Sequence, residues 1–199
     1  MTNRVALATS NLGKRAELEP LFKELNVEFE LPSKSTLDLI RETGLSFIEN
    51  ALIKARAVAA ATQLPTIADD SGLMVDALGG KPGIHSARYA GTPSHAERNN
   101  LKLLKALADT PEAARGAQFV CVLVYLRSFD DPQPLIGYGR WLGRILCEPI
   151  GTNGFGYDPL FFDDHMLQSA AELSSDVKNR ISHRAQAAHQ LQQQLAKYG

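Results

Sequence analysis

The stretch RVALATSNLGK, residues 4–14, combines the pattern of a strand with that of a turn. Its first part, residues 4–8, is a short apolar run that predicts a buried strand, and its second part is a polar turn with one glycine. Apolar side chains then recur between residues 18 and 25 at the spacing of one helix face, and residues 27–31 alternate as a second strand. The opening of the chain is therefore predicted to be a strand, turn, helix and strand unit.

Two capping boxes predict where further helices begin. In residues 46–49 a serine is followed three positions later by glutamate, so a helix is expected there that ends near Pro65. Residues 94–97 repeat this pattern. The polar segment 33–44 reads as a loop. The second of these helices is expected to carry Leu101, Leu104 and Leu107.

The remaining strands are predicted from apolar runs. Residues 66–68 form a brief strand that places acidic side chains at its carboxyl end, where sites of α/β proteins often lie. Residues 117–126 are the clearest strand, and residues 135–147 are expected to be its antiparallel neighbour, broken at Gly143. A last helix is expected to begin between residues 175 and 182.

Composition excludes several classes of protein. The 199 residues are 44% hydrophobic and 22% charged, as in an ordinary globular protein. The 21 basic and 22 acidic side chains give a net charge of −1, which disfavours binding to nucleic acid or anionic membranes. The longest apolar run, residues 119–126, is far short of the about 20 residues of a membrane span. No secretory signal opens the sequence, so we expect a cytoplasmic protein with reduced thiols at Cys121 and Cys147.

The polar turn after the first strand is a candidate phosphate site. It lies between a strand and a helix, where backbone amides and the positive end of the helix dipole favour an anion. Lys14 would add a point charge. The spacing is not that of the Walker motif, and for this segment taken alone a plain helix cap with an exposed lysine is the favoured interpretation.

The run Asp69-Asp70-Ser71-Gly72 is a candidate metal site. Magnesium prefers oxygen ligands, usually one or two carboxylates with phosphate oxygens and water. The alternative is an Asx turn that caps a loop. Glu42 or Glu49 could add a further ligand, and Glu42 is favoured because the capping box already accounts for Glu49.

The glycine-rich loop 151–158 contains two aromatic residues, an arrangement that suits stacking against a heterocyclic base. A hairpin loop with its aromatic side chains packed inward is the alternative. Basic side chains follow near the last helix and read either as a solvated face or as hydrogen-bond donors to oxo groups and phosphates. They are Lys178, Arg180, His183 and Arg184.

The order of these segments resembles the inosine triphosphate pyrophosphatase family, over roughly residues 4 to 190, and is similar to its bacterial house-cleaning members. The matching segments are residues 9–14, Glu42-Thr43-Gly44, 49–55, 67–73, 79–89, 154–159 and Ser182-His183-Arg184.

This resemblance implies an α/β fold with a long mixed central sheet flanked by helices, and a nucleotide cleft between two lobes. It implies that residues 1–199 form a single pyrophosphatase domain and that the protein is a homodimer. The implied activity is Mg²⁺-dependent hydrolysis of ITP, dITP, XTP and dXTP to the monophosphate and pyrophosphate, which keeps deaminated purines out of DNA and RNA.

The resemblance also assigns roles to residues of this sequence. Asp70 would ligate metal and act as the catalytic base, and Ser71 would contact substrate. The triphosphate would be bound by Thr9, Ser10, Asn11, Leu12, Gly13 and Lys14. The base pocket would contain Phe155, Gly156, Tyr157, Asp158, Lys178, His183 and Arg184.

Two departures from the family pattern affect these assignments. Some relatives have two acids before the Thr-Gly pair, but the first position here is Arg41, so either Glu42 or Asp69 would complete the metal shell of Asp70. The roles of Asp69 and Asp70 could also be exchanged. Ser10 replaces a glycine found in many relatives, a smaller change.

Two rival functions remain at this point. One is a pyrophosphatase that acts on another altered base, and the other is a catalytically silent nucleotide-binding module. The presence of Asp69, Asp70 and Lys14 together argues against the silent module, because binding alone does not call for paired acids near phosphates.

Overall fold

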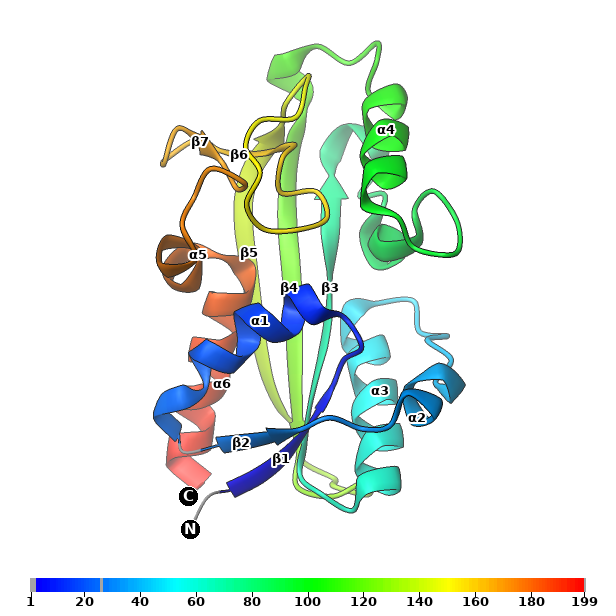
Figure 1. The fold of residues 1–199 in the computed structure, drawn as a ribbon, viewed down its shortest axis with the longest axis vertical. Helices are drawn as coiled ribbons and strands as arrows, with labels where there is room; N and C mark the ends of the chain where they lie inside the picture. The colour runs from blue at the N-terminus through cyan, green and yellow to red at the C-terminus, as the bar shows by residue number, and fades with distance from the viewer. Residues whose placement is uncertain (1–2, 26, 199) are drawn as a thin grey trace. The chain divides into compact units, whose positions relative to one another are not determined.

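The computed structural model describes residues 3–25 and 27–198 (Figure 1). Within these residues, one mixed sheet has the strand order β2-β1-β3-β4-β5-β6-β7 and is flanked by helices, which confirms the predicted fold class. The strands are β1 (Asn3–Ala8), β2 (Val27–Glu30), β3 (Thr66–Val75), β4 (Gly116–Leu126), β5 (Leu135–Ile145), β6 (Phe161–Asp163) and β7 (Gln168–Ser169).

In the first half of the chain the helices alternate with these strands, and two helices, α5 and α6, are its last elements. No helix within the described ranges is long and apolar enough to cross a membrane. The α-helices are α1 (Leu12–Leu21), α2 (Lys34–Leu39), α3 (Phe47–Thr62), α4 (Ala96–Ala106), α5 (Ser175–Ile181) and α6 (His183–Tyr198). Short 3₁₀ turns lie at Lys23–Leu25, Asp76–Leu78, Gly83–Arg88 and Glu112–Ala114.

Strand β1 pairs with its two neighbours in parallel. Val5 lies opposite Phe29 of β2, and Leu7 lies opposite Ile67 of β3. The other end of the sheet is antiparallel, with Ile145 of β5 opposite Phe161 of β6. The strand, turn, helix and strand unit predicted from residues 4–31 is therefore present, with β1 and β2 side by side.

The chain divides into two compact units. The first contains Met1–Asp70, Cys121–Gly139 and His183–Gly199, and the second contains Ser71–Val120 and Arg140–Ser182. The core of the second unit contains Leu73 and Val75 of β3 and the aromatic residues Phe119, Trp141 and Phe161. Leu103 of α4 and Leu107, which caps the end of that helix, pack against them.

The first unit buries both faces of its strands, and alternation along each strand decides which residue faces which helix. Leu7 and Ile67 pack with Leu18 of α1 and with α6, two helices that lie side by side (Figure 1). Ala8 and Ala68 pack against α3 on the opposite face. Odd-numbered residues of β3 in this unit therefore face α1 and α6, and even-numbered residues face α3.

Helix α6 approaches the backbone of β5 closely. A Cβ atom at Gly139 would overlap the carbonyl oxygen of His183, and one at Gly137 would overlap that of Ala187. The Gln194 side chain donates to the Ile136 carbonyl oxygen at 2.6 Å. The glycines therefore fix the start of α6, and with it the position of His183, against the strand.

Three sequence expectations about strands and loops are corrected. Strand β3 does not end at residue 68 but runs on to Val75. Strand β5 is continuous through Gly143, where the missing side chain makes room for the Phe162 carbonyl oxygen. The expected loop at 33–44 contains α2, because the Ser33 hydroxyl caps this short helix at the Thr36 amide.

Two expectations about helices are corrected as well. The Ser94 hydroxyl donates to the Ala87 carbonyl and does not cap α4, whose buried side includes Leu103, while Leu101 is 67% exposed. The final helix is divided in two because Ser182 has an extended backbone, with φ −66° and ψ 162°. By contrast, the capping box at Ser46 is confirmed, since its hydroxyl accepts from the Glu49 amide.

Candidate functional site

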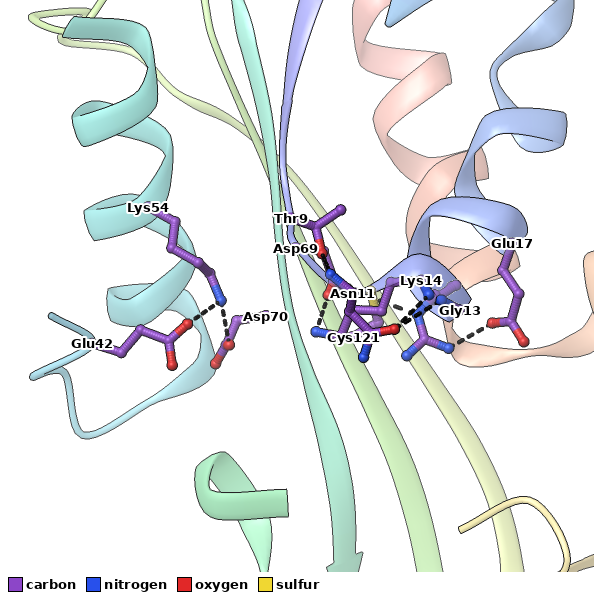
Figure 2. A network of polar contacts seen from close by, with 11 residues as sticks. Thr9, Asn11, Gly13, Lys14, Glu17, Glu42, Lys54, Asp69, Asp70 and Cys121 are labelled. Atoms are coloured by element: carbon purple, nitrogen blue, oxygen red, sulfur yellow. Dashed lines mark hydrogen bonds and ion pairs between the residues drawn. The ribbon is translucent and has the colours of Figure 1, made fainter. Parts of the chain in front are cut away.

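Asp69 and Asp70 are the centre of the candidate site, and the continuation of β3 determines how they point. Both lie inside the strand rather than at its end, so their side chains leave on opposite faces. Figure 2 shows Asp69 on the side of α1 and Asp70 on the side of α3. Charged residues are uncommon within strands, and here each carboxylate is compensated by a lysine from the helix that it faces.

Asp69 is surrounded by donors. One carboxylate oxygen pairs with the Lys14 ammonium, and the other accepts from the Cys121 thiol at 3.2 Å. The Arg184 Nε atom lies 3.9 Å from the same oxygen. Burial opposes ionisation of Asp69, which is 1% exposed, but the charges of Lys14 and Arg184 lower its pKa below the ordinary value. Asp69 is therefore a carboxylate anchored between two cations.

The predicted phosphate loop connects β1 to α1. Asn11 caps the helix, and its side-chain oxygen accepts from the amides of Gly13 at 2.9 Å and Lys14 at 3.1 Å. The Thr9 hydroxyl accepts from the Asn11 amide at 3.1 Å. Asn11 therefore caps α1 and occupies these two amides, as the plain helix cap considered from sequence predicts. The Lys14 side chain nevertheless points toward β3 (Figure 2).

The basic residues of α5 and of the start of α6 do not form the solvated face considered from sequence. Lys178, His183 and Arg184 are all buried, whereas Arg180 is exposed. Arg184 belongs to α6, and one of its terminal nitrogens donates to Glu17 of α1 at 2.6 Å. The first unit therefore brings Arg184 to the same face of β3 as Lys14.

Asp70 has a different environment. The Lys54 ammonium donates to its Oδ1 atom at 2.6 Å and to Oε1 of Glu42 at 2.8 Å. The Asp70 Oδ2 atom is buried and has no hydrogen-bond partner among the described residues. Burial raises the pKa of Asp70 in spite of the opposing charge of Lys54. The Lys54 pKa is raised, because its two carboxylates outweigh the effect of burial.

The loop that carries Glu42 is held by α3. The Asn50 side-chain oxygen accepts from the Gly44 amide at 2.8 Å, and a Cβ atom at Gly44 would overlap this side chain. Glu49 accepts from the Leu45 amide and the Ser46 hydroxyl, so it remains in the capping box and away from Asp70. Glu42 is therefore the glutamate that the structure brings to Asp70.

Glu42 and Asp70 fit a divalent cation. They are two carboxylates already gathered around a cation, and Asp70 has an unpartnered oxygen, which suits the oxygen preference of magnesium. The structure does not bring Asp69 to this pair, because Asp69 faces α1. Within the described ranges, no three His, Cys, Asp or Glu residues gather as a metal cluster, so substrate or water oxygens would have to complete the coordination.

The expected base-pocket residues of the second unit are also brought together. Asp158 accepts from the Phe155 amide at 2.9 Å and from the Lys178 ammonium at 2.7 Å. The positive φ of Gly154, +72°, and the absence of its side chain allow Asp158 to fold back on the loop. Phe155 is partly buried and Ser71 is partly buried in β3.

The two aromatic residues of this loop differ. Tyr157 lies in the hydrophobic core, where its hydroxyl donates to the Ser86 carbonyl at 2.8 Å. The inward-packed interpretation is therefore correct for Tyr157, which leaves Phe155 as the candidate for stacking on a base. The Gly156 carbonyl accepts from Asn100 of α4 at 3.0 Å, which holds the loop to that helix.

Sequence reasoning missed several residues that shape the site. Lys54 had a signal, because it is a charged residue on the helix face that also buries Ala51 and Val58. The roles of Cys121 and Glu17 had none, because each depends on a partner far away in sequence.

This α/β protein directs a partly buried lysine from a helix amino terminus toward one strand and gathers two carboxylates on the other face of that strand. Such an arrangement can bind a phosphorylated ligand together with a metal. The comparisons with known proteins narrow this class. The chain belongs to the Ham1 family, whose sequence model matches residues 5–194.

Relatives with curated names share about half of the sequence. The "dITP/XTP pyrophosphatase" of Xylella fastidiosa (strain 9a5c) is 50% identical over 188 residues, 94% of each chain. That of Shigella flexneri is 52% identical over 184 residues, 92% of this chain and 93% of the relative. The solved structure of a HAM1 protein from Coxiella burnetii superposes with a TM-score of 0.89 at 43% identity, covering 98% of this chain and 99% of the other. The resemblance inferred from sequence is confirmed.

Proposed function

We propose that this protein hydrolyses dITP, ITP, XTP and dXTP to the nucleoside monophosphate and pyrophosphate with Mg²⁺, and so removes deaminated purines from the nucleotide pool. The observation that carries the proposal is the 50% identity, over 94% of the chain, to a relative named dITP/XTP pyrophosphatase. The geometry of β3 supports it, because cations for phosphate and carboxylates for a metal lie on the two faces of one strand.

The triphosphate would be bound at the α1 amino terminus. In this proposal the loop from Thr9 to Lys14 receives phosphate oxygens, which the helix dipole and the Lys14 ammonium attract. Asp69 and Glu17 hold Lys14 and Arg184 on this face in advance of binding. The charge of the leaving pyrophosphate would thus meet cations that are already positioned.

Glu42 and Asp70 would hold the magnesium ion. The metal would neutralise charge on the phosphates, as it does in other phosphoryl-transfer enzymes. Asp70 would orient a water molecule for in-line attack and accept its proton, since its buried Oδ2 atom is an acceptor that no described residue uses. Ser71, the next residue on the strand, would contact substrate.

The second unit would contribute to base recognition. Phe155 would stack on the purine, and the Lys178 ammonium, held by Asp158, would donate to the 6-oxo group. His183 and Arg184 of the first unit are further candidate donors. An adenine amino group would place a donor against these donors, and each hydrogen bond to the 6-oxo group that is lost would cost about 1–3 kcal/mol. The site would therefore favour hypoxanthine and xanthine over adenine.

Assembly and location complete the proposal. We expect one pyrophosphatase domain built from the two units, acting as a homodimer in the cytoplasm. Sedimentation velocity of the purified chain tests whether it is a homodimer, and a single species of monomer mass would contradict that expectation. Cell fractionation tests the expected location in the cytoplasm.

The experiment that tests the activity compares dITP, XTP, dATP and dGTP with and without Mg²⁺ and identifies the products. We expect Mg²⁺-dependent release of pyrophosphate from dITP and XTP, with much slower reaction of dATP and dGTP. The matched control is Asp70→Asn, purified in the same way, which should lower the activity by about 10³-fold. Absence of cleavage of every triphosphate would overturn the proposal and favour a silent binding module, while preference for another altered base would reassign the substrate.

A further inference from the structure

Lys54 occupies the position that a cation would take between the two candidate metal ligands. Its ammonium lies 2.6 Å from Oδ1 of Asp70 and 2.8 Å from Oε1 of Glu42. Lys54 is 9% exposed and Asp70 is 6% exposed, so water screens these charges weakly. A divalent ion approaching both carboxylates would meet the repulsion of this ammonium at short range.

The same carboxylates are incompletely satisfied by Lys54. Asp70 Oδ2 is buried and has no hydrogen-bond partner in the described part of the chain. A buried oxygen without a hydrogen-bond partner is costly. The ion pair with Lys54 therefore leaves one acceptor of Asp70 available to a ligand. A lysine has one positive charge and a flexible stem, so it can leave these carboxylates when another anion becomes available.

We propose that Lys54 is a placeholder cation that gathers Glu42 and Asp70 in the free protein and opposes metal binding until nucleotide arrives. This inference rests on the proposed function in taking a triphosphate as the anion that draws Lys54 away. The metal and the nucleotide then bind together, because each removes the obstacle to the other: phosphate provides the lysine with a new partner, and the metal provides the carboxylates with a new cation.

The opposite face of β3 offers a matched control. Lys14 has the same charge and is also directed at an aspartate of this strand, but its partner is Asp69. Neutralising Lys14 removes a charge from the neighbourhood of Asp70 without vacating the position between Glu42 and Asp70. Comparison of the two lysines therefore separates direct replacement from general electrostatic attraction.

The test measures Mn²⁺ binding to the nucleotide-free protein by electron paramagnetic resonance, with Mn²⁺ as the probe for the oxygen site. We expect Lys54→Met to bind Mn²⁺ at least about tenfold more tightly than the natural protein, and Lys14→Met to change binding by no more than about threefold. Lys54→Arg retains the charge and should bind as weakly as the natural protein. Adding Asp70→Asn to Lys54→Met should abolish the gain.

Unchanged or weaker Mn²⁺ binding by Lys54→Met, in a variant with the natural circular dichroism spectrum, would overturn the inference. So would a gain that persists after Asp70→Asn is added. If Lys54→Met does not fold, Lys54→Gln tests the same point, and a non-hydrolysable dITP analogue should increase the Mn²⁺ affinity of the natural protein. A protein that meets these expectations but cleaves no triphosphate would support the placeholder and overturn the proposed activity.

Discussion

Asp69 and Asp70 are neighbours in sequence, yet the two faces of β3 treat them in opposite ways (Figure 2). Asp69 has partners for both oxygens, Lys14 on one and the Cys121 thiol on the other. Asp70 shares Lys54 with Glu42 and keeps one buried oxygen without a described partner. One dipeptide therefore supplies a structural anchor on one face and an incompletely satisfied carboxylate on the other.

The pKa shifts express the same difference. Nearby cations lower the pKa of Asp69, so the fold favours its charge, whereas burial raises the pKa of Asp70, so the fold opposes its charge. A buried carboxyl group whose charge the fold opposes is characteristic of a functional group. The comparison supports the proposed roles, in which Asp70 takes part in the chemistry and Asp69 positions the cations that would bind phosphate.

The largest effect is expected for Asp70→Asn. Loss of the acceptor and metal ligand should lower kcat for dITP by about 10³-fold. The free energy of unfolding should stay the same or rise, because a neutral amide avoids the cost of the buried charge. Steady-state kinetics and urea denaturation of the same preparation measure both quantities. If kcat of the variant stayed within about tenfold of that of the natural enzyme, the catalytic group would not be Asp70 and would have to lie elsewhere than on this face of β3.

Asp69→Asn should have the converse effect. It removes the carboxylate that pairs with Lys14 on this face of β3, while Glu17 still accepts from Arg184. Breaking a buried ion pair by removing one partner costs about 3 kcal/mol, which should appear as a lower unfolding free energy in urea. We expect a higher KM for triphosphate as well, since Lys14 is less well positioned. A stable Asp69→Asn variant with a collapsed kcat would mean that the two aspartates exchange roles.

The pH dependence of stability should differ in sign between the two aspartates. The folded pKa of Asp69 lies below its unfolded value near 3.8, so its stabilisation is present above that pH and is lost as the pH falls below it. The stability difference between the natural protein and Asp69→Asn should therefore shrink as the pH falls from about 4 toward 2.

For Asp70 the folded pKa is raised, so the cost of its charge is absent below pH 3.8 and appears as the pH rises through the folded pKa. Asp70→Asn should gain stability relative to the natural protein over that rise. Urea midpoints measured at several pH values check both signs. If the stability of the two variants changed with pH in the same way, the two aspartates would not differ as proposed.

The sequence was sufficient for much of this picture but placed Asp69 and Asp70 wrongly in the fold. Apolar runs and the strand–turn–helix order at residues 4–31 predicted β1, α1 and β2, because periodicity is a local property. The strand at residues 66–68 was ended too early, since two acids and a glycine are unfavourable in a strand. Its continuation depends on Lys14 and Lys54, which come from helices elsewhere in the chain.

Once β3 is known to continue to Val75, alternation alone separates the two aspartates. The capping box, a local motif, favoured Glu42 over Glu49 as a metal ligand, and the structure brings Glu42 beside Asp70 while Glu49 stays in the box. The burial of Lys178, His183 and Arg184 was not predictable in the same way, because their partners include Asp158 and Glu17, distant in sequence. Local signals thus identified most of the residues, and tertiary contacts decided their environments.

The smallest expected effect concerns Cys121, whose thiol donates to Asp69. Cys121→Ala removes the donor to Asp69 Oδ2 and should lower the unfolding free energy by about 1 kcal/mol, whereas Cys121→Ser retains a donor and should cost less. Because the thiol acts through Asp69, Cys121→Ala should cost less in an Asp69→Asn background, while its cost should be unchanged in an Asp70→Asn background. Urea denaturation of the two double-mutant cycles measures this coupling. Equal coupling to both aspartates would mean that the faces of β3 are not independent, and the assignment of separate roles would fail.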